Sequence, residues 1–365
     1  MTYRVIGLMS GSSLDGLDIV FTELVFDGKK WQYEILVADC LPYSEEWINK
    51  LRDATHLNAY DYMLLHIAYG HYLGQQANHF IETNNLHYKV ALIASHGHTT
   101  FHDPAKKMTA QLGDGAAIAA VTQLPVVSDL RALDIAFGGQ GAPIVPIGEK
   151  LLLGDHAFFL NLGGIANISF NKDDEYIAFD VCPANRVLNM LSADAGKIFD
   201  EGGQLAASGN INQALFDQLN ALEYYRQPYP KSLANDFGTN IVYPIIKNSG
   251  CSIPDALCTM TEHIAFQIKK SVEELISHQP SQNKSLLATG GGAHNKFLVE
   301  RLQDHLSALN TDVVIPDAQL INYKEALVMA LIGVLRWRQE YNVLHTVTGA
   351  NRDSIGGALW IGQQA

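Results

Sequence analysis

The sequence lacks the features that define several large protein classes. Only four cysteines occur among 365 residues, and none belongs to a C-x-x-C pair, so nothing indicates a disulfide scaffold. No basic-then-apolar leader precedes the first expected strand, which starts at Tyr3. No apolar run approaches the roughly 20 residues that cross a bilayer. We therefore expect a cytoplasmic protein that has no membrane partner.

Positive charge is also scarce. The 25 Lys and Arg residues against 38 Asp and Glu residues give a net charge of −13, which argues against general binding to nucleic acid. A small anionic substrate stays possible, because local cations or a metal ion can hold one. The chain lacks the P-loop pattern G-x-x-x-x-G-K-[S/T], and the glycines of residues 138–141 lack dinucleotide-fingerprint spacing. Length and composition fit a globular protein of two domains.

The most informative segment that is present covers residues 7–18. It lies between two apolar runs, Tyr3–Met9 and Leu17–Leu24, so the Gly, Ser and Asp residues between them predict a β-hairpin. Successive backbone N–H groups in such a turn can hold phosphate oxygens. The carboxylates of Asp15 and Asp18 suit Mg²⁺, which takes oxygen ligands and bridges to phosphates. A polar turn without any ligand is the alternative, because these residue types dominate turns.

A second copy of this pattern occurs in the middle of the chain. An apolar run, Ala157–Leu160, leads into the glycine-containing residues 161–167, and the expected strands Ile168–Phe170 and Tyr176–Asp180 follow. The first copy likewise continues into a third expected strand, Trp31–Cys40. This internal repeat predicts two related halves, each of which opens with a glycine-rich hairpin.

Two further features point to nucleotide chemistry. Residues 290–295 form a third glycine-rich turn, between the apolar run Leu286–Thr289 and a helix-period segment at 296–309. The order strand, glycines, helix is typical of nucleotide sites, since a helix N-terminus favours negative charge. Asp180 ends a strand and precedes a turn into a helix that we expect to begin near Asn185. Such a carboxylate can accept a proton from a nucleophile, or it can simply cap the turn.

These segments resemble the sugar kinase/Hsp70/actin superfamily and, within it, the anhydro-N-acetylmuramic acid kinase family. The segments that carry the resemblance keep their order along nearly the whole chain: 7–18, 95–99, 111–114, 125–129, 138–143, 161–167, 179–180, 290–295, 324–326 and 348–350. The resemblance implies an α/β fold of two domains, a duplicated ribonuclease H-like fold with a central cleft. It implies an N-terminal-type domain of residues 1–128 plus about 346–365, and a C-terminal-type domain of residues 129–345.

The resemblance also implies an activity, that of an ATP- and Mg²⁺-dependent kinase of peptidoglycan recycling that forms a homodimer. The family hydrolyses the 1,6-anhydro bridge of anhydro-N-acetylmuramic acid and phosphorylates O6, which gives N-acetylmuramic acid 6-phosphate. Asp180 matches the family's catalytic base, which activates water to attack the anomeric carbon. After this Asp the chain has Val181 and Cys182, where the family usually has Thr-Gly, and Asn189 replaces a frequent second Asp.

The resemblance assigns further residues to the two ligands. The positions implied for ATP are Gly11, Ser12, Ser13, Leu14, Asp15, Gly16, Asp18, Gly163, Gly164, Asn167, Gly202, Gly291 and Gly292, with Asp15 and Asp18 as the Mg²⁺ ligands. The positions implied for the sugar are His96, Thr99, Asp129, Arg131 and Glu325. A guanidinium can hold the lactyl carboxylate of the sugar, although Arg131 could instead pair with Asp129 or Asp134. Glu325 could instead cap a helix expected over Ala326–Leu335.

Two other classes of function stay open at this level. One is an ATP- or sugar-binding sensor of the same superfamily that does not phosphorylate its ligand. The other is a metal-dependent hydrolase or transferase, because His96, His98 and His102 are close in sequence and could bind a metal ion. Their spacing fits no named zinc motif, so we favour a strand over Val90–Ser95 that ends with His96 and Thr99 near the sugar.

Overall fold

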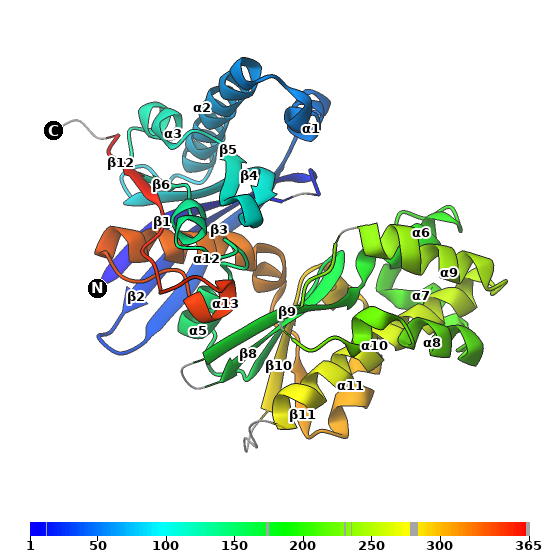
Figure 1. Cartoon of the computed structure of the whole chain (residues 1–365). Coiled ribbons are helices and arrows are strands. Elements are labelled where there is room, and N and C mark those ends of the chain that lie inside the picture. Colours follow the sequence, from blue (N-terminus) through cyan, green and yellow to red (C-terminus); the bar gives the residue numbers. More distant parts are fainter. Residues whose placement is uncertain (12, 173–174, 230, 235, 278–283, 363–365) are drawn as a thin grey trace. The chain divides into compact units, whose positions relative to one another are not determined.

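The chain forms two compact units in the computed structural model (Figure 1), which describes all residues except 12, 173–174, 230, 235, 278–283 and 363–365. Unit 1 contains residues 1–153 and 323–365, and unit 2 contains residues 154–322. These units are sets of residues that contact one another, whereas the expected domains are those that the family resemblance implies. The domain boundaries near residues 128 and 346 therefore stay a prediction.

The sheet of unit 1 begins with a meander of three antiparallel strands, β1, β2 and β3. β4 then runs parallel to β1, and β6 runs parallel to β4, which gives the order β12-β6-β4-β1-β2-β3 with β5 beside β4. The strands are β1 (Thr2–Ser10), β2 (Gly16–Phe26), β3 (Trp31–Pro42), β4 (Leu92–Asp103), β5 (Met108–Leu112), β6 (Val126–Ser128) and β12 (Ala358–Trp360).

The sheet of unit 2 repeats this plan. β7, β8 and β9 form an antiparallel meander, β10 runs parallel to β7, and β11 runs parallel to β10, in the order β11-β10-β7-β8-β9. The strands are β7 (Phe158–Leu162), β8 (Ile165–Lys172), β9 (Glu175–Pro183), β10 (Lys284–Thr289) and β11 (Thr311–Val314). The repeated strand order confirms the predicted α/β, duplicated ribonuclease H-like fold.

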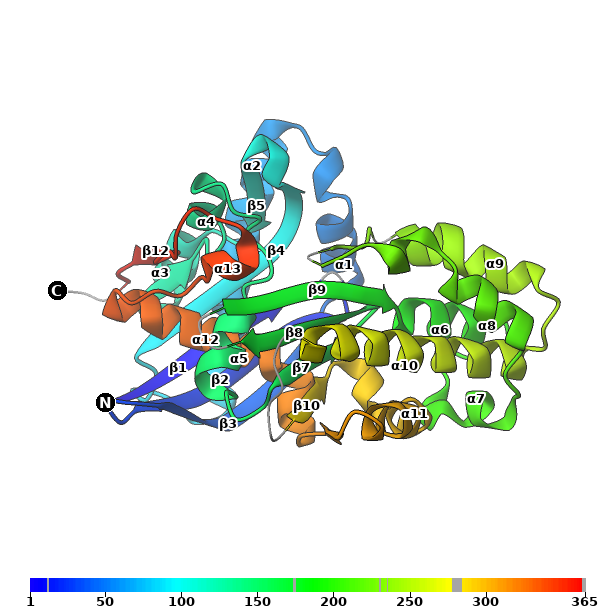
Figure 2. The ribbon, with the colours of Figure 1, turned by 60° about the horizontal axis from the view of Figure 1, so that its bottom comes forward.

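Helices cover the faces of both sheets. In unit 1 they are α1 (Glu45–Arg52), α2 (Ala59–Thr83), α3 (Gly115–Thr122), α4 (Ala132–Ala136), α5 (Pro146–Leu152) and α13 (His345–Thr348). In unit 2 they are α6 (Asn185–Ala193), α7 (Gln204–Ser208), α8 (Gln213–Asn220), α9 (Tyr243–Asn248), α10 (Ile253–Ser277) and α11 (Lys296–Ser307). α10 runs along the sheet of its unit, with α11 beside it (Figure 2). α12 (Ala318–Arg338) belongs to unit 1 from Tyr323 onward.

The two faces of β1 explain why α2 and α12 lie on opposite sides of the first sheet. Ile6 and Leu8 point into an apolar cluster that includes Tyr69 and Leu73 of α2. Gly7 points the other way, where a Cβ atom would collide with the backbone oxygen of Ala326 in α12. Side chains alternate across a strand, so this single glycine lets α12 lie directly on the sheet.

α12 bears on the expectation that no segment of the chain crosses a membrane. Within the described residues it is the one helix that is long and apolar enough to cross a bilayer, but 72% of its apolar window is buried inside the protein. A helix of this kind is hydrophobic on all sides because it is a core helix of the unit.

The structure corrects two expected boundaries. The strand expected over Val90–Ser95 is β4, which continues to Asp103, so His96, His98 and Thr99 lie within a strand and not at its end. It continues because β5 pairs with its second half. The helix expected from Ala326 begins at Ala318, so Glu325 cannot cap its N-terminus.

Candidate active site

The predicted phosphate hairpin of unit 1 is ordered by one of its own carboxylates. The side chain of Asp15 accepts a hydrogen bond from the Ser13 hydroxyl (2.6 Å) and another from the backbone N–H of Gly16 (3.0 Å). Leu14 has a left-handed backbone, with φ of 60°. At Gly11 a Cβ atom would make only ordinary contact, no closer than 3.4 Å, with the Ser13 side chain. Ser12, another predicted ligand of ATP, lies outside the described residues.

Asp18 lies one strand position inside this hairpin, where it is half-buried on β2. The pKa of its carboxyl group is raised to about 6, mainly by burial and in smaller part by the charges of Asp15 and Glu325, against a hydrogen bond with the Cys40 thiol that lowers it. The same surroundings raise the pKa of Cys40 to about 12. Ionised Asp18 is therefore repelled by two neighbouring carboxylates, and a divalent cation beside it would relieve that repulsion.

A chain of buried hydroxyl groups lies beneath the hairpin, and no sequence pattern indicated it. Tyr43 donates a hydrogen bond to the Ser10 hydroxyl (2.8 Å) and shares another with Tyr69 (2.6 Å). Ser10 in turn contacts Nδ1 of His98 (3.1 Å). These groups fix the end of β1, from which the hairpin starts. Two of them are aromatic residues far apart along the chain, so only the fold brings them together.

The predicted sugar-side residues His96 and Arg131 contact each other. Arg131 donates from Nε to His96 Nε2 (2.8 Å) and from Nη1 to the carbonyl oxygen of Gly141 (2.6 Å). Burial, together with the guanidinium, lowers the pKa of His96 to about 3, so this imidazole is neutral. Among the described residues Arg131 makes no ion pair with Asp129 or Asp134, so the alternative structural pairing is not found.

The remaining sugar-side candidates are more open. Asp129 is exposed, has a left-handed backbone with φ of 56° and accepts a hydrogen bond from Ser128 (2.8 Å). Thr99 is exposed on β4, and Glu325 is half-buried on α12 near Arg131 and Asp18. A left-handed aspartate is a costly conformation that often accompanies a functional role.

The histidines of β4 do not form a metal site. Within the part of the chain that the structure describes, no group of three His, Cys, Asp or Glu side chains could hold a metal ion. His96 faces a guanidinium, His98 contacts Ser10, and His102 contacts the Thr109 hydroxyl (3.2 Å). Their side chains therefore serve separate contacts.

The second glycine hairpin is a tighter turn than the first. Gly163 and Gly164 join β7 to β8 directly, and their carbonyl oxygens accept hydrogen bonds from the backbone N–H groups of Asn185 (3.1 Å) and Ala184 (2.8 Å). These contacts connect the hairpin to the beginning of α6. At Gly164 a Cβ atom would meet only the Arg186 side chain, at 3.6 Å or more, so the outer face of the turn is open.

Asp180 lies on β9 beside the same meander. Asn167 of β8 stands opposite Asp180 on one side and opposite Asn161 of β7 on the other, so the three polar side chains form a row across the sheet. The Asp180 carboxylate accepts a hydrogen bond from the backbone N–H of Leu233 (2.8 Å). Burial raises its pKa, and this hydrogen bond lowers it in part.

The third glycine turn lies at the carboxyl end of β10. Gly292 is buried against Leu162, where a Cβ atom would approach to 2.7 Å, whereas Gly291 has open space with its nearest neighbour at 3.7 Å. Asn185 joins this region to β7 by donating to the Leu162 carbonyl oxygen (2.7 Å). Gly202, in a short helical turn before α7, has φ of 63°, and a Cβ atom there would have no neighbour within 4 Å.

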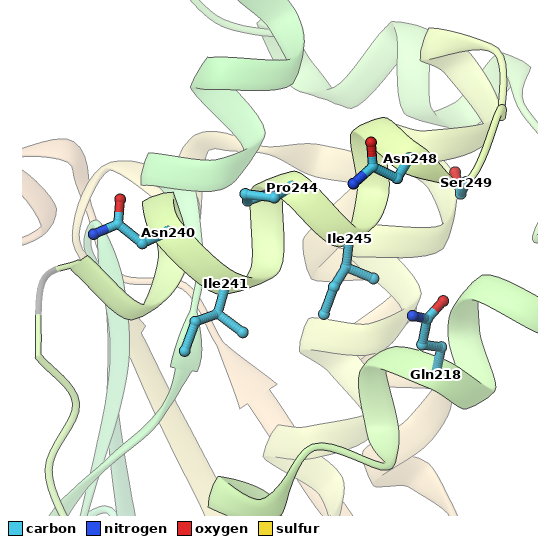
Figure 3. Close-up of a pocket in the computed structure, with 7 residues that line it drawn as sticks. All are labelled: Gln218, Asn240, Ile241, Pro244, Ile245, Asn248 and Ser249. Carbon is cyan, nitrogen blue, oxygen red and sulfur yellow. The ribbon is translucent and has the colours of Figure 1, made fainter.

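A surface hollow of about 400 Å³ lies elsewhere in unit 2 (Figure 3). It is lined by residues of α8, α9 and the π-helical turn η5 (Phe237–Val242): Gln218, Asn240, Ile241, Pro244, Ile245, Asn248 and Ser249. None of these residues is a predicted ligand or carries an ionisable side chain. We therefore do not place the chemistry in this hollow.

The fold is duplicated, and each half begins with a glycine-rich hairpin. These two features define a protein of the sugar kinase/Hsp70/actin class. The family model described as anhydro-N-acetylmuramic acid kinase matches residues 3–362. The chain belongs to the anhydro-N-acetylmuramic acid kinase family, and it is therefore a kinase.

Individual relatives agree with this assignment. The anhydro-N-acetylmuramic acid kinase of Aliivibrio fischeri is 36% identical over 83% of this chain and 84% of its own length. That of Hydrogenovibrio crunogenus is 33% identical over 97% of both chains. Among solved structures, component A of the Acidaminococcus fermentans (R)-2-hydroxyglutaryl-CoA dehydratase is 14% identical, covers 91% of this chain and 97% of its own, and has a TM-score of 0.47. A likeness at that level says nothing about function.

Proposed function

We propose that this kinase uses ATP and Mg²⁺ to convert 1,6-anhydro-N-acetylmuramic acid into N-acetylmuramic acid 6-phosphate during peptidoglycan recycling. Family membership supports the activity. The observation that carries the residue assignment is the Asp180 carboxylate, which is partly desolvated on a strand edge and held through one oxygen by the Leu233 N–H. A carboxylate whose pKa is raised by burial suits a general base.

In this proposal Asp180 takes a proton from water as the water oxygen forms a bond to the anomeric carbon. The bond from that carbon to the bridge oxygen breaks, and this oxygen, now O6 of the sugar, takes the γ-phosphoryl group of ATP. ADP leaves, and the proton on Asp180 passes to solvent. Phosphorylation offsets the charge that would develop on the departing oxygen, which makes an otherwise poor leaving group acceptable.

The residues near the first hairpin fit the nucleotide and its metal ion. Asp18 and Asp15 would hold Mg²⁺, which neutralises phosphate charge, and a cation there would relieve the repulsion that raises the pKa of Asp18. One or two carboxylates, with phosphate oxygens completing the set, is the usual way proteins hold Mg²⁺. We assign the phosphates to the hairpin of Gly11 and Ser13, and to Gly163 and Gly164 of the second hairpin.

The other predicted ligands complete the assignment. Leu14, Gly16 and Asn167 shape the two hairpins, and Gly202, Gly291 and Gly292 would lie near the adenosine. The positive φ of Gly202 and the unobstructed space at Gly291 support this.

For the sugar, we assign the lactyl carboxylate to Arg131. Its Nε and Nη1 are fixed by His96 and Gly141, which preorganises the guanidinium and leaves Nη2 without a described partner. Thr99, Asp129 and Glu325 would contact the remaining polar groups of the sugar. A cytoplasmic location and a homodimer stay part of the proposal.

The decisive experiment compares the wild type with Asp180→Asn. ADP release is measured with Mg²⁺-ATP and the anhydro-sugar, and the sugar product is weighed by mass spectrometry. We expect the wild-type product to be heavier than the substrate by one phosphoryl group (HPO₃) plus one water. The variant should bind ATP normally but lose about 10²- to 10⁴-fold in turnover, because its shape is kept while the base is lost. Normal turnover in the variant would rule out Asp180 as the base.

A further inference from the structure

Asp180 lies on the edge strand of its sheet. β9 is an edge strand, so its outer backbone groups have no neighbouring strand to pair with among the described residues. The pairing with β8 also shifts here, because Asn167 stands opposite Asp180 while Ala166 stands opposite Cys182. A bulge of this kind bends the strand and re-aims its side chains. The sheet alone therefore does not fix the direction of the Asp180 carboxylate.

A separate segment supplies the missing partners. We call residues 224–229 and 231–233 the Asp180 strap. The Tyr224 hydroxyl donates to the Asp180 carbonyl oxygen (2.6 Å), and the Asp180 backbone N–H donates to the Lys231 carbonyl oxygen (3.0 Å). The Leu233 N–H donates to Oδ2 of Asp180 (2.8 Å). No described residue donates to Oδ1, which is therefore the oxygen left to take a proton.

The strap is itself anchored by aromatic contacts. Tyr224 is buried, its ring lies 5.6 Å from that of Phe237, and the Lys231 ammonium lies 4.8 Å above its centroid. Tyr229 stacks on Phe179, the residue before Asp180, with ring centroids 5.4 Å apart. These contacts hold the Tyr224 hydroxyl in one place, so its hydrogen bond to the strand edge is preorganised.

We propose that Tyr224 is a positioning residue for the reaction: its hydroxyl holds the Asp180 carbonyl, fixes the bulged edge of β9 and so aims Oδ1 of Asp180 at the attacking water. This inference rests on the proposed role of Asp180 as the base. Without the hydroxyl, the partly buried carbonyl oxygen of Asp180 loses its donor and the strand edge shifts away from the strap. The Leu233 hydrogen bond then weakens, and the pKa of Asp180 rises further, because that bond favours the ionised carboxylate.

Asp18 of the first hairpin also ionises in the acid range, because its pKa is about 6, so the position of the acid limb does not by itself identify Asp180. The shift of that limb between the wild type and the variant is what reports the Asp180 carboxylate. Burial raises the pKa values of Tyr224 and Cys182, which keeps both protonated at neutral pH. Burial lowers the pKa of Lys231, and the charge of Glu274 on α10 opposes that shift.

The test is Tyr224→Phe, with Tyr225→Phe as the matched control. Tyr225 is the adjacent tyrosine, but its hydroxyl contacts Nε2 of His263 (3.0 Å) and not Asp180. Values of kcat and KM are measured with the anhydro-sugar and ATP between about pH 4.5 and 9. Tyr224→Phe should lower kcat about 10- to 100-fold and leave KM for ATP nearly unchanged. It should also move the acid limb upward by about half a pH unit or more, whereas Tyr225→Phe keeps the wild-type limb.

The outcomes separate the possibilities. An unshifted acid limb in Tyr224→Phe overturns the positioning role, and so does an equal shift in Tyr225→Phe, which would indicate general loosening of the turn. If Tyr224→Phe does not fold, Leu233→Pro, which removes the N–H that donates to Oδ2 and also fixes the local φ, must produce the upward shift. A wild type that fails to convert the sugar refutes the proposed function itself. An active wild type with an unshifted acid limb in Tyr224→Phe refutes only the role of Tyr224 and leaves the proposed function standing.

Discussion

Replacing Asp18 with Asn should stabilise the protein while it abolishes turnover. The native surroundings raise the pKa of Asp18 from 3.8 to about 6, mainly through burial and then through the charges of Asp15 and Glu325. The folded state therefore prefers the protonated carboxyl group, and Asn has the same shape and charge as that protonated form. In the proposed function an ionised Asp18 would serve the metal ion, at a cost in stability.

The size and pH range of this effect follow from linkage. A shift of about 2 pKa units corresponds to roughly 3 kcal/mol, which solvent screening of the half-buried Asp18 reduces to about 1–2 kcal/mol. Well below pH 3.8 the group is protonated in both states, so it carries no penalty. Between pH 3.8 and about 6 the unfolded group ionises while the native group still holds its proton, so the favourable contribution of the protonated form is lost progressively, and the loss is complete above the folded pKa. The variant's advantage should therefore be near zero at pH 3, partial at pH 4.5 and complete above pH 7.

Denaturant unfolding of the wild type and Asp18→Asn at pH 4.5 and pH 8, without nucleotide, measures this difference. Asp39→Asn is the control, because it removes the same charge from an exposed site on the neighbouring strand. We expect the gain in midpoint for Asp18→Asn to be clearly larger at pH 8 than at pH 4.5, where only part of the penalty has developed. A gain that is equal at both pH values, or a loss at pH 8, would refute the reasoning about burial and neighbouring charge.

Two further predictions concern packing and substrate binding. Gly7→Ala places a Cβ atom against the Ala326 backbone oxygen, so it should lower the unfolding free energy by more than about 2 kcal/mol, measured by denaturant unfolding. A midpoint like that of the wild type would show that α12 can move away from β1 freely. Arg131→Lys keeps the charge but cannot serve His96 and Gly141 together, so KM for the sugar should rise about tenfold or more while KM for ATP stays constant. Equal changes in both constants would point to a general disturbance of unit 1.

The fold was predictable because its signals are local and repeated. Each meander is a run of short apolar strands separated by glycine-rich or charged turns, and the same order occurs twice. The register that places Asp180 opposite Asn167 depends on a bulge, which no composition signal revealed. The length of β4 depends on its pairing with β5, and no local pattern placed those two strands side by side.

The candidate site was predictable only where chemistry and local sequence coincide. Asp15 and Asp18 stand in a turn whose residue types already suggest phosphate and metal. Tyr224 and Leu233 could not be found in this way, because each reaches Asp180 from far along the chain and neither lies in a recognisable motif. Long-range contacts to a strand edge are a property of the fold and not of any short pattern.

The two hairpins show how one repeated unit can serve two purposes. β1 ends at Ser10 and β2 begins at Gly16, so the first turn has room for hydroxyl groups and a carboxylate that orders them. In the second, β8 follows β7 after only Gly163 and Gly164, whose carbonyl oxygens accept hydrogen bonds from the start of α6. In the second turn, therefore, only the backbone N–H groups on its outer face could contact a phosphate. We expect the first hairpin to set the affinity for Mg²⁺, and the second to act mainly through its shape.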